Sequence, residues 1–581
     1  MTIARTLAFT AAALTLPALN LAACATTPPP SATPRDSTAF TLATDQPLTP
    51  EQQAMRFDKA DLSIRVLPED KAIDAVAVLD FTAKAPLHRL EVELDTLLAI
   101  SSVQIDGVEV AADRWSNPEG RLTVQLPRPL AVGESGALRV AYAGRPRVAP
   151  RAPWDGGFVW STAPSGEPWI ATAVQGEGCD IFWPCIDSPH GEPARVDLHI
   201  TVPSDLSAPS NGRFMGKVDH GDGWTTWNWS AKSPNTYAIA LNVGPYEEVR
   251  GQYQSRFGNT IPMNYWHLKS DAPEKVQALF AEFPKMLDFF EANVGPFPFG
   301  DEKMGVVETP HLGMEHQTIN AYGNDYKIDG RGYDWLLQHE FAHEWFGNQL
   351  TNQNADDMWL HEGLGSYMQP LYARWLLGDR YMQRELANQR EGLVNKFPVV
   401  SGTPKTEDEV YKGDVGPGGD IYSKGSLISH SLRMLIGDAA FHQALTRLVY
   451  GTDDPRPGAF KPLYRSTGDF LQIVNQVTGQ DYGWFFRGYL YNAALPALTQ
   501  TREGDVLRLE WATGNGETFP MPLEIEIDGR VQTVAMTGGR GEIAVPAGAH
   551  VLIDPQNKVL RQMEVIDALQ AYKAEQKAKT Q

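Results

Sequence analysis

The segment "HEFAH" at residues 339–343 places two histidines one helical turn apart. On an α-helix, residues i and i+4 lie about 40° apart around the axis, so the side chains of His339 and His343 can meet at one point. Trp335 and Phe346 fall in the same sector, which indicates that this side of the helix faces a core. Two imidazoles in such a place are either ordinary core histidines or ligands of one metal ion.

Acidic residues near the pair favour the metal. Glu340 is costly to bury unless it has a partner such as the water ligand of a metal ion. Glu362 follows His343 after eighteen residues, and an antiparallel helix after a short loop can bring its carboxylate to the histidines. Because a catalytic zinc takes three protein ligands and keeps one open position, we predict one Zn²⁺ per chain on His339, His343 and Glu362. An aspartate at 356–357 is expected to cap the second helix and to hydrogen-bond a ligand histidine.

The period of the apolar residues divides the chain. Alternating runs such as "LHRLEVELDTL" predict antiparallel sheets from about residue 55 to 250, and alternation returns after "YNAALPALTQTR". From about residue 270 the period is helical, and Pro284 is expected to kink or split the first helix. The predicted segments are a signal peptide at 1–24, a flexible linker at 25–50, a β-domain at 51–250, a zinc catalytic domain at 251–492, a β-sandwich at 493–562 and a charged helical tail at 563–581.

"HEFAHEWFGNQLT", followed after an interval by "WLHEGLG", resembles the gluzincin aminopeptidases, the family that contains aminopeptidase N and the leukotriene-epoxide hydrolase. The resemblance extends over roughly residues 55–490 and includes "SPNTYAIALNVGPYE". It implies a multidomain α+β fold with an N-terminal antiparallel β saddle domain, a thermolysin-like, mainly helical catalytic domain and a small C-terminal β-sandwich. It also implies that the two histidines and Glu362 bind Zn²⁺ and that Glu340 is the general base.

The resemblance extends to a site for the substrate's α-amine. "HLGMEHQT" at residues 311–318 resembles the family's G-x-M-E-N signature, although His316 replaces the asparagine. Glu315 then binds the amine, while Gly313 and Met314 lie along the substrate backbone. A cationic amine needs a carboxylate or amide oxygen at a fixed distance from the metal, so such an anchor would make the enzyme an exopeptidase.

Two further residues receive roles from the resemblance. "VQGEGCDIFWPCID" is similar to the family segment that places a glutamate or glutamine beside the same amine; counting back from Pro184 assigns Gln175, with Glu177 as the competing choice. "GGDIYSKGS" resembles the family's Y-x-K-G motif, whose phenol points at the zinc. Tyr422 is therefore expected to stabilise the oxyanion, since a phenol with a pKa near 10 stays protonated at neutral pH.

The N-terminus predicts export. Arg5 precedes "TLAFTAAALTLPALNLAAC", an apolar run too short to span a membrane comfortably and typical of a secretory signal. Its end, residues 21–24, resembles a bacterial lipobox, which predicts cleavage before Cys24 and lipidation of that residue; an ordinary signal cleaved nearby is the alternative. The expected location is the periplasmic face of a bacterial envelope membrane, with the outer membrane favoured, and the linker would act as a tether.

The expected function is removal of the N-terminal residue from peptides with a free amine. The alternatives are a thermolysin-like endopeptidase, an epoxide hydrolase and a non-catalytic zinc-containing peptide-binding protein. The epoxide hydrolase is considered because the leukotriene-epoxide hydrolase has glutamine at the position of Gln175. The formal net charge of −21 argues against nucleic acid as a partner. Cys179 and Cys185 could pair or remain free thiols, and neither the oligomeric state nor the preferred first side chain can be read from the sequence.

Overall fold

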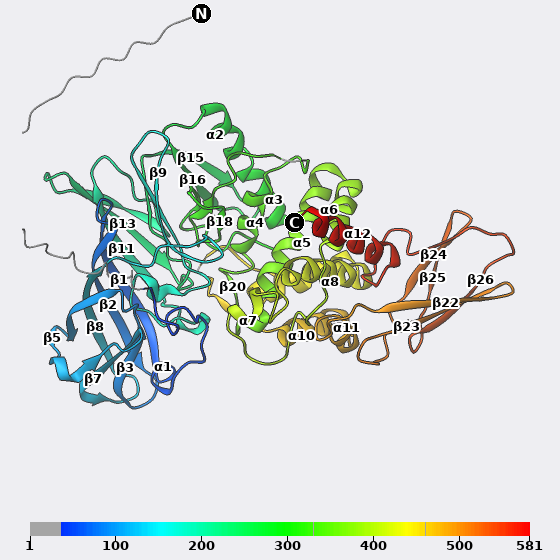
Figure 1. The fold of residues 1–581 in the computed structure, drawn as a ribbon, viewed down its shortest axis with the longest axis horizontal. Coiled ribbons are helices and arrows are strands. Elements are labelled where there is room, and N and C mark those ends of the chain that lie inside the picture. The colour runs from blue at the N-terminus through cyan, green and yellow to red at the C-terminus, as the bar shows by residue number, and fades with distance from the viewer. Residues whose placement is uncertain (1–35, 329, 459, 581) are drawn as a thin grey trace, which may run out of the picture. The chain divides into compact units, whose positions relative to one another are not determined.

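The computed structural model describes residues 36–328, 330–458 and 460–580. The predicted signal peptide, Cys24 and the first part of the predicted linker lie outside these residues. Within the described part of the chain, no helix combines the length and apolarity that crossing a bilayer requires. Figure 1 shows the first β-domain in blue and cyan, the helical part in green and yellow, and the last strands in orange.

The N-terminal domain is built on an eight-stranded sheet in the order β12-β13-β11-β1-β2-β8-β4-β5, with two three-stranded sheets, β3-β7-β6 and β14-β10-β9. The sheet is antiparallel except where β1 pairs with β11 in parallel. Alternating burial along β1 and β2 gives the large sheet one apolar face. The strands are β1 Met55–Leu67, β2 Ala72–Ala83, β3 Leu87–Glu93, β4 Leu98–Ile105, β5 Val108–Glu109, β6 Trp115–Ser116, β7 Arg121–Leu130, β8 Ser135–Gly144, β9 Gly157–Thr162, β10 Pro168–Ala173, β11 Arg195–Pro203, β12 Arg213–Asp219, β13 Trp224–Lys232 and β14 Asn242–Val243, and the one α-helix of this part is α1 Pro50–Gln53.

Residues 37–49, predicted as the end of a flexible linker, lie against this domain instead. Thr41 is buried, Leu42 and Leu48 pack on the apolar core, and the Arg121 guanidinium lies 4.5 Å from the centre of the Phe40 ring. The linker prediction is therefore wrong for this stretch. Its proline and threonine content suggested a tether, but its few apolar side chains are enough to hold it to the sheet.

The cysteines of this domain form a disulfide between Cys179 and Cys185, with their Cα atoms 6.3 Å apart. The sequence left both pairing and free thiols open. Both residues are fully buried beside the sheet, so the bond closes the loop that follows the candidate amine-binding segment.

The second domain combines a five-stranded sheet, β15-β16-β17-β19-β18, with a set of helices. The sheet starts with β15 at Tyr246, so the predicted boundary at residue 251 falls inside this strand. Pro284 lies in the first turn of α3, and the chain breaks between α2 and α3 as predicted. The elements are β15 Tyr246–Gln254, β16 Thr260–Leu268, α2 Pro273–Phe280, α3 Phe283–Asn293, β17 Met304–Glu308, β18 Gly313–Met314, β19 Asn320–Tyr322, α4 Trp335–His343, β20 Leu350–Asn352, α5 Trp359–Leu377, α6 Asp379–Glu391, α7 Asp408–Tyr411, α8 Asp420–Ile436, α9 Asp438–Tyr450, β21 Leu463–Arg465, α10 Thr467–Thr478 and α11 Gly483–Tyr489.

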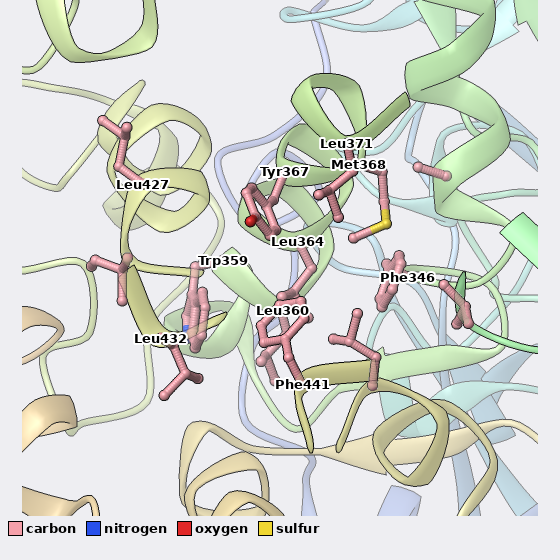
Figure 2. Close-up of a cluster of buried hydrophobic side chains, with 14 of the residues drawn as sticks. Phe346, Trp359, Leu360, Leu364, Tyr367, Met368, Leu371, Leu427, Leu432 and Phe441 are labelled. Atoms are coloured by element: carbon pink, nitrogen blue, oxygen red, sulfur yellow. The ribbon is translucent and has the colours of Figure 1, made fainter. Parts of the chain in front are cut away.

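Helix α5 is the centre of this domain. It is buried on most of its circumference, and Figure 2 shows its side chains, among them Leu360, Leu364 and Met368, in the same apolar cluster as Leu427 of α8 and Phe441 of α9. A helix that is apolar on nearly all sides belongs inside a domain. Any functional side chain on α5 therefore has a rigid support.

The last part of the chain forms two three-stranded antiparallel sheets, β22-β23-β26 and β25-β24-β27, and then a helix, α12. These match the predicted β-sandwich and helical tail, so the predicted multidomain α+β architecture is confirmed. Helix α12 is held to the second domain, because Gln570 donates to the carbonyl of Leu393 at 2.8 Å. The elements are β22 Ala497–Glu503, β23 Val506–Ala512, β24 Leu523–Ile527, β25 Arg530–Val534, β26 Arg540–Ala544, β27 Val551–Ile553 and α12 Glu564–Thr580.

Candidate metal centre and substrate cavity

Helix α4 brings the two histidines together. Its N-terminus is capped by Asp334, whose side chain accepts a hydrogen bond from the amide of Leu337. One turn apart on this helix, His339 and His343 place their Nε2 atoms 3.1 Å from each other. The predicted convergence of the two imidazoles is confirmed.

Glu362, in the first turn of α5, completes the cluster. Its Oε2 atom lies 3.6 Å from Nε2 of His339 and 3.5 Å from Nε2 of His343. This oxygen is buried and has no hydrogen-bond partner, whereas Oε1 accepts hydrogen bonds from Tyr411 and Tyr422 at 2.8 and 2.9 Å. One oxygen is thus held by protein donors, and the other is left for a ligand that the protein does not supply.

The three donor atoms fit a zinc ion. Ligands at about 2.0–2.1 Å from a tetrahedral zinc are about 3.4 Å from one another, and the three separations here are 3.1, 3.5 and 3.6 Å. Two imidazoles and a carboxylate form a common donor set of catalytic zinc sites. The unpartnered oxygen of Glu362 would gain its missing partner from the metal.

The second nitrogen of His343 is also positioned. Its Nδ1 lies 2.9 Å from the carbonyl of Phe346, and because a carbonyl only accepts, Nδ1 carries a proton and Nε2 is the atom that faces Glu362. The prediction that Asp356 or Asp357 would do this, and would cap α5, is wrong. Both carboxylates turn away to satisfy other backbone amides, Asp356 at residues 401–402 and Asp357 at the start of α10.

Two glycines allow α5 and α8 to approach closely. A Cβ atom added to Gly363 would lie 2.9 Å from the Cα of Gly425, and one added to Gly425 would lie 2.9 Å from the Cα of Gly363. Nothing larger than glycine fits at this crossing without a shift of the helices. Since Gly425 follows Tyr422 by one helical turn, the close crossing is what places the Tyr422 hydroxyl beside Glu362.

These side chains open into one cavity of about 610 Å³. It has the size typical of ligand sites. The lining includes every site residue predicted from the sequence within the described part of the chain, namely Gln175, Gly313, Met314, Glu315, His339, Glu340, His343, Glu362 and Tyr422. The competing residue Glu177 lines the same cavity.

Strand β18 forms one wall beside Glu340. A Cβ atom on Gly313 would lie 2.4 Å from Oε1 of Glu340, so a glycine is needed where the strand passes the carboxylate. Glu315, directly after the strand, is buried and accepts a hydrogen bond from the hydroxyl of Tyr237 at 2.8 Å. Strand β18 is the last strand of its sheet, so its free edge is available to an extended peptide.

Several carboxyl groups surround the histidines in the cavity. Burial raises the pKa of Glu340 well above its usual value; His343 opposes this, and Glu315 and Glu362 add to it. Burial alone would lower the pKa of His343, but the surrounding carboxylates raise it to about 10. Such a cluster of buried acids is matched to a cationic partner.

Gln175 and Glu177 differ in the hydrogen bonds that their side chains make. The amide nitrogen of Gln175 donates to the hydroxyl of Tyr411 at 3.3 Å. Glu177 has a buried oxygen without a partner, and burial raises its pKa to about 7. Both remain candidates for contact with the substrate amine, through the carbonyl oxygen of Gln175 or the carboxylate of Glu177.

Three residues of the cavity region were not predicted. Tyr237 lies in "SPNTYAIALNVGPYE", a segment that carried the family resemblance without a role for this residue. Tyr411 and Glu407 come from a short helix and the residue before it, in the stretch "KTEDEVYKG", which has no periodicity or motif that points to a site. Only spatial proximity identifies them.

Comparison with known proteins agrees with this geometry. Residues 57–237 match the peptidase M1 N-terminal domain, and residues 313–489 match the peptidase family M1 domain. The structure is similar to that of a mutant M1 zinc metallopeptidase from Deinococcus radiodurans bound to a Tyr-Ser-Ala substrate, with a TM-score of 0.64 and 26% identity over 77% of this chain and 96% of that one.

Among curated sequences, Probable aminopeptidase 2 of Sulfurisphaera tokodaii is 21% identical over 80% of this chain, and leucyl aminopeptidase of Saccharolobus solfataricus is 22% identical over 75%. The chain spans 60% and 54% of the lengths of these two relatives. The two matched domains together cover the β-domain and all three candidate zinc ligands. The chain therefore belongs to peptidase family M1.

Proposed function

We propose that the chain is a zinc-dependent aminopeptidase that removes the N-terminal residue from peptides. One observation carries the proposal: the three zinc-compatible donors and the carboxylate of Glu315 line the same cavity. A site for metal-assisted hydrolysis and a site for an ammonium group are thus combined at a fixed separation. The aminopeptidases among the relatives support the same activity.

His339, His343 and Glu362 would hold one zinc ion per chain. When bound there, Zn²⁺ supplies Lewis acidity, which polarises a carbonyl and lowers the pKa of water. Glu340, between the two histidines in sequence and lining the same cavity, takes a proton from the attacking water and returns it to the leaving nitrogen. This transfer requires a carboxylate within hydrogen-bond reach of both atoms.

Tyr422 is the proposed oxyanion donor. A phenol has a single O–H, so Tyr422 can donate either to Glu362, as it does here, or to the substrate oxygen. When Tyr422 turns to the substrate, Tyr411 still donates to the same oxygen of Glu362. Tyr411 therefore acts as a positioning residue for the metal ligand during the reaction.

The substrate is held by its amine and its backbone. Glu315, with Glu177 or Gln175, binds the α-ammonium group, and the free edge of Gly313–Met314 pairs with the extended peptide. Because the amine is anchored at a set distance from the zinc ligands, the cut falls after the first residue.

The test is a set of aminoacyl p-nitroanilides and short peptides, each with a free and with an acetylated amine. We expect hydrolysis of the free forms, loss of activity on acetylation, loss with a chelator and recovery with zinc. Glu340→Gln should still bind zinc but lower kcat by orders of magnitude. Equal cleavage of acetylated peptides would indicate an endopeptidase, and zinc binding without turnover would indicate a peptide-binding protein.

We further propose that the protein is exported and attached to a bacterial envelope membrane through a lipid on Cys24. The support is the lipobox-like end of the N-terminal apolar run. Incorporation of labelled palmitate into the wild type, and its loss in Cys24→Ala, is the expected result. Labelling that persists in the variant would contradict the assignment.

A further inference from the structure

A group of carboxylates lies in the first domain, outside the substrate cavity. Asp180 is within the disulfide loop, Asp187 follows that loop, and Glu93 is the last residue of β3. Together with Thr41 and Gln46 of the N-terminal segment 37–49, they line a small hollow of about 10 Å³. A hollow of this volume holds a single particle the size of a water molecule. Three stretches that are far apart in the sequence thus bring oxygen atoms to one enclosed point.

The side chain of Asp180 lacks a partner for its charge. The residue is 1% exposed, and neither of its carboxylate oxygens has a hydrogen-bond partner. Burial raises its pKa well above the usual value and the charges of Asp187 and Glu93 add to this, whereas the Thr41 hydroxyl opposes it. An ion that is enclosed by its ligands leaves them no surface for solvent, so the full burial of these oxygens fits a structural ion. A buried carboxylate of this kind indicates a cation that the chain itself does not supply.

Gly178 keeps the carboxylates of Asp180 and Asp187 close together. A Cβ atom on this glycine would lie 2.4 Å from Oδ2 of Asp187 and 2.8 Å from Oδ1 of Asp180, so these two oxygens are at most about 5 Å apart. Ligands at about 2.3–2.6 Å from a calcium ion are separated by up to about 5 Å across it. The backbone at Gly178 has a φ of 95°, which favours glycine, and any side chain there would displace the two oxygens. The spacing therefore suits two ligands of one calcium ion.

The polar groups that line the hollow favour calcium over other metals. They are three carboxylates, the hydroxyl of Thr41 and the side-chain amide of Gln46, and the described lining residues include no histidine and no cysteine. Zinc and other transition metals bind well to nitrogen and sulfur, whereas oxygen donors suit Ca²⁺ and Mg²⁺. Mg²⁺ usually keeps several water ligands, for which a hollow of this size has no room. Ca²⁺ accepts about six to eight oxygens in irregular arrangements.

We propose that this hollow binds one Ca²⁺ ion through the carboxylates of Glu93, Asp180 and Asp187. The ion would tie the N-terminal segment to the loop that follows the candidate amine-binding residues. Direct contacts run along the same path, because Asp187 accepts a hydrogen bond from the amide of Cys179 at 3.2 Å and the Thr44 hydroxyl hydrogen-bonds the same carboxylate. The site is separate from the candidate zinc centre, and the inference does not depend on the proposed aminopeptidase activity.

The test uses the whole chain with zinc restored to its own site. The protein is stripped of metals with a chelator, reloaded with one equivalent of Zn²⁺ and titrated with CaCl₂ by isothermal titration calorimetry. Thermal unfolding and the hydrogen exchange of the amides of residues 38–46 are then measured with and without Ca²⁺. The variants are Asp180→Asn and the control Asp70→Asn, which makes the same change at an exposed position in the turn between β1 and β2.

For the wild type we expect one Ca²⁺ per chain with a Kd of about 10⁻⁶–10⁻⁴ M. At about a hundredfold excess over this Kd, the Tm should rise by about 5 °C and exchange in residues 38–46 should slow by about tenfold or more. Asp180→Asn should bind Ca²⁺ about a hundredfold more weakly and lose both effects. Without Ca²⁺ its Tm should equal or exceed that of the wild type, because it removes a buried negative charge, and this result also shows that the variant is folded. Asp70→Asn should behave as the wild type does.

Three results would overturn the inference. They are no uptake of Ca²⁺ by the zinc-loaded wild type at about 10 mM, well above the Kd of even weak extracellular calcium sites, unchanged binding in Asp180→Asn, and binding that leaves exchange in residues 38–46 unaltered, which would place the ion elsewhere. In the first case the carboxyl groups would hold protons in place of a metal. Burial raises the pKa of Glu93 from 4.5 to about 7, so stability would then fall as the pH rises through this range. Peptide hydrolysis is assayed separately, and none of these results bears on it.

Discussion

Replacing Tyr411 by phenylalanine tests how the protein holds the candidate zinc ligand Glu362. The change removes one of two phenol donors, at 2.8 Å from Oε1, and keeps the volume of the ring in a buried position. A hydrogen bond to a charged group contributes about 1.5–3 kcal/mol. Since Tyr422 still donates to the same oxygen, we take the lower end, which corresponds to about tenfold weaker zinc binding.

Tyr422→Phe distinguishes an effect on zinc binding from an effect on the chemical step. It removes the second donor to Oε1 of Glu362, so zinc affinity should fall by a similar factor of about ten. At saturating zinc, however, its kcat should stay about 10²–10³-fold below the wild type, because the oxyanion donor is gone. Tyr411→Phe should recover most of its kcat when zinc is in excess.

Zinc affinity is measured by titrating the metal-free protein against a chromophoric chelator, and kcat is measured separately with zinc in excess. Tyr237→Phe is the matched control, because its hydroxyl donates to Glu315 and does not contact Glu362. The reasoning is refuted if Tyr411→Phe binds zinc within twofold of the wild type. It is also refuted if excess zinc restores the kcat of Tyr422→Phe.

Gly425→Ala is expected to lower the unfolding free energy by about 1–3 kcal/mol in denaturant titrations, although alanine usually favours a helix; a more stable variant would contradict the tight crossing with α5. Burial lowers the pKa of His316 from 6.5 to about 3, and neither ring nitrogen has a partner. Between pH 6.5 and about pH 3 the unfolded chain binds a proton at His316 that the folded chain does not, so His316 lowers the free energy of unfolding by about 2 kcal/mol at pH 5 relative to neutral pH. His316→Asn should therefore lose less stability in acid than the wild type, and stability profiles that run parallel for the two proteins would contradict this. Glu177→Gln should raise KM for free-amine substrates about tenfold, and Gln175→Leu should raise it less because a carboxylate binds an ammonium group more strongly than a neutral amide oxygen does; the opposite order would assign the amine to Gln175.

The convergence of the candidate metal ligands could be predicted because their geometry is local. His339 and His343 share a face of one helix whatever the rest of the fold does, and Glu362 follows within one helix-loop-helix unit. The sequence shows the glycine of the Y-x-K-G motif but not why a glycine is needed there. Gly425 packs against Gly363, sixty-two residues earlier, and that contact exists only in three dimensions.

The outer partners of these ligands could not be predicted for the same reason. The sequence suggested nearby aspartates, because an aspartate before a helix is a frequent cap, but the backbone turns both carboxylates toward other loops. The groups that support the ligands are a carbonyl at Phe346 and the phenol of Tyr411, which lies forty-nine residues from Glu362. Neither has a pattern of its own in the sequence.

The proposed amine anchor, Glu315, and the candidate metal ligands are joined by the residue after His343. The buried carboxylate of Glu344 accepts hydrogen bonds from the amide of Thr318 and from Asn348, and Asn348 also donates to the carbonyl of Glu315. The segment with Glu315 is therefore bonded directly to the end of the helix that carries the histidines.

The β-domain holds the same segment from the other side. Asn211 donates to the carbonyl of Gln317, and the amide of Gly212 donates to the hydroxyl of Thr318, at 2.8 and 2.7 Å. All four groups are buried, so these bonds are shielded from water. The distance from Glu315 to the candidate metal ligands, which would set where a peptide is cut under the proposed function, thus depends on both domains. A helical domain alone would keep its zinc ligands but would lose this constraint and the side chain of Glu177, and with them the basis for cutting one residue from the end.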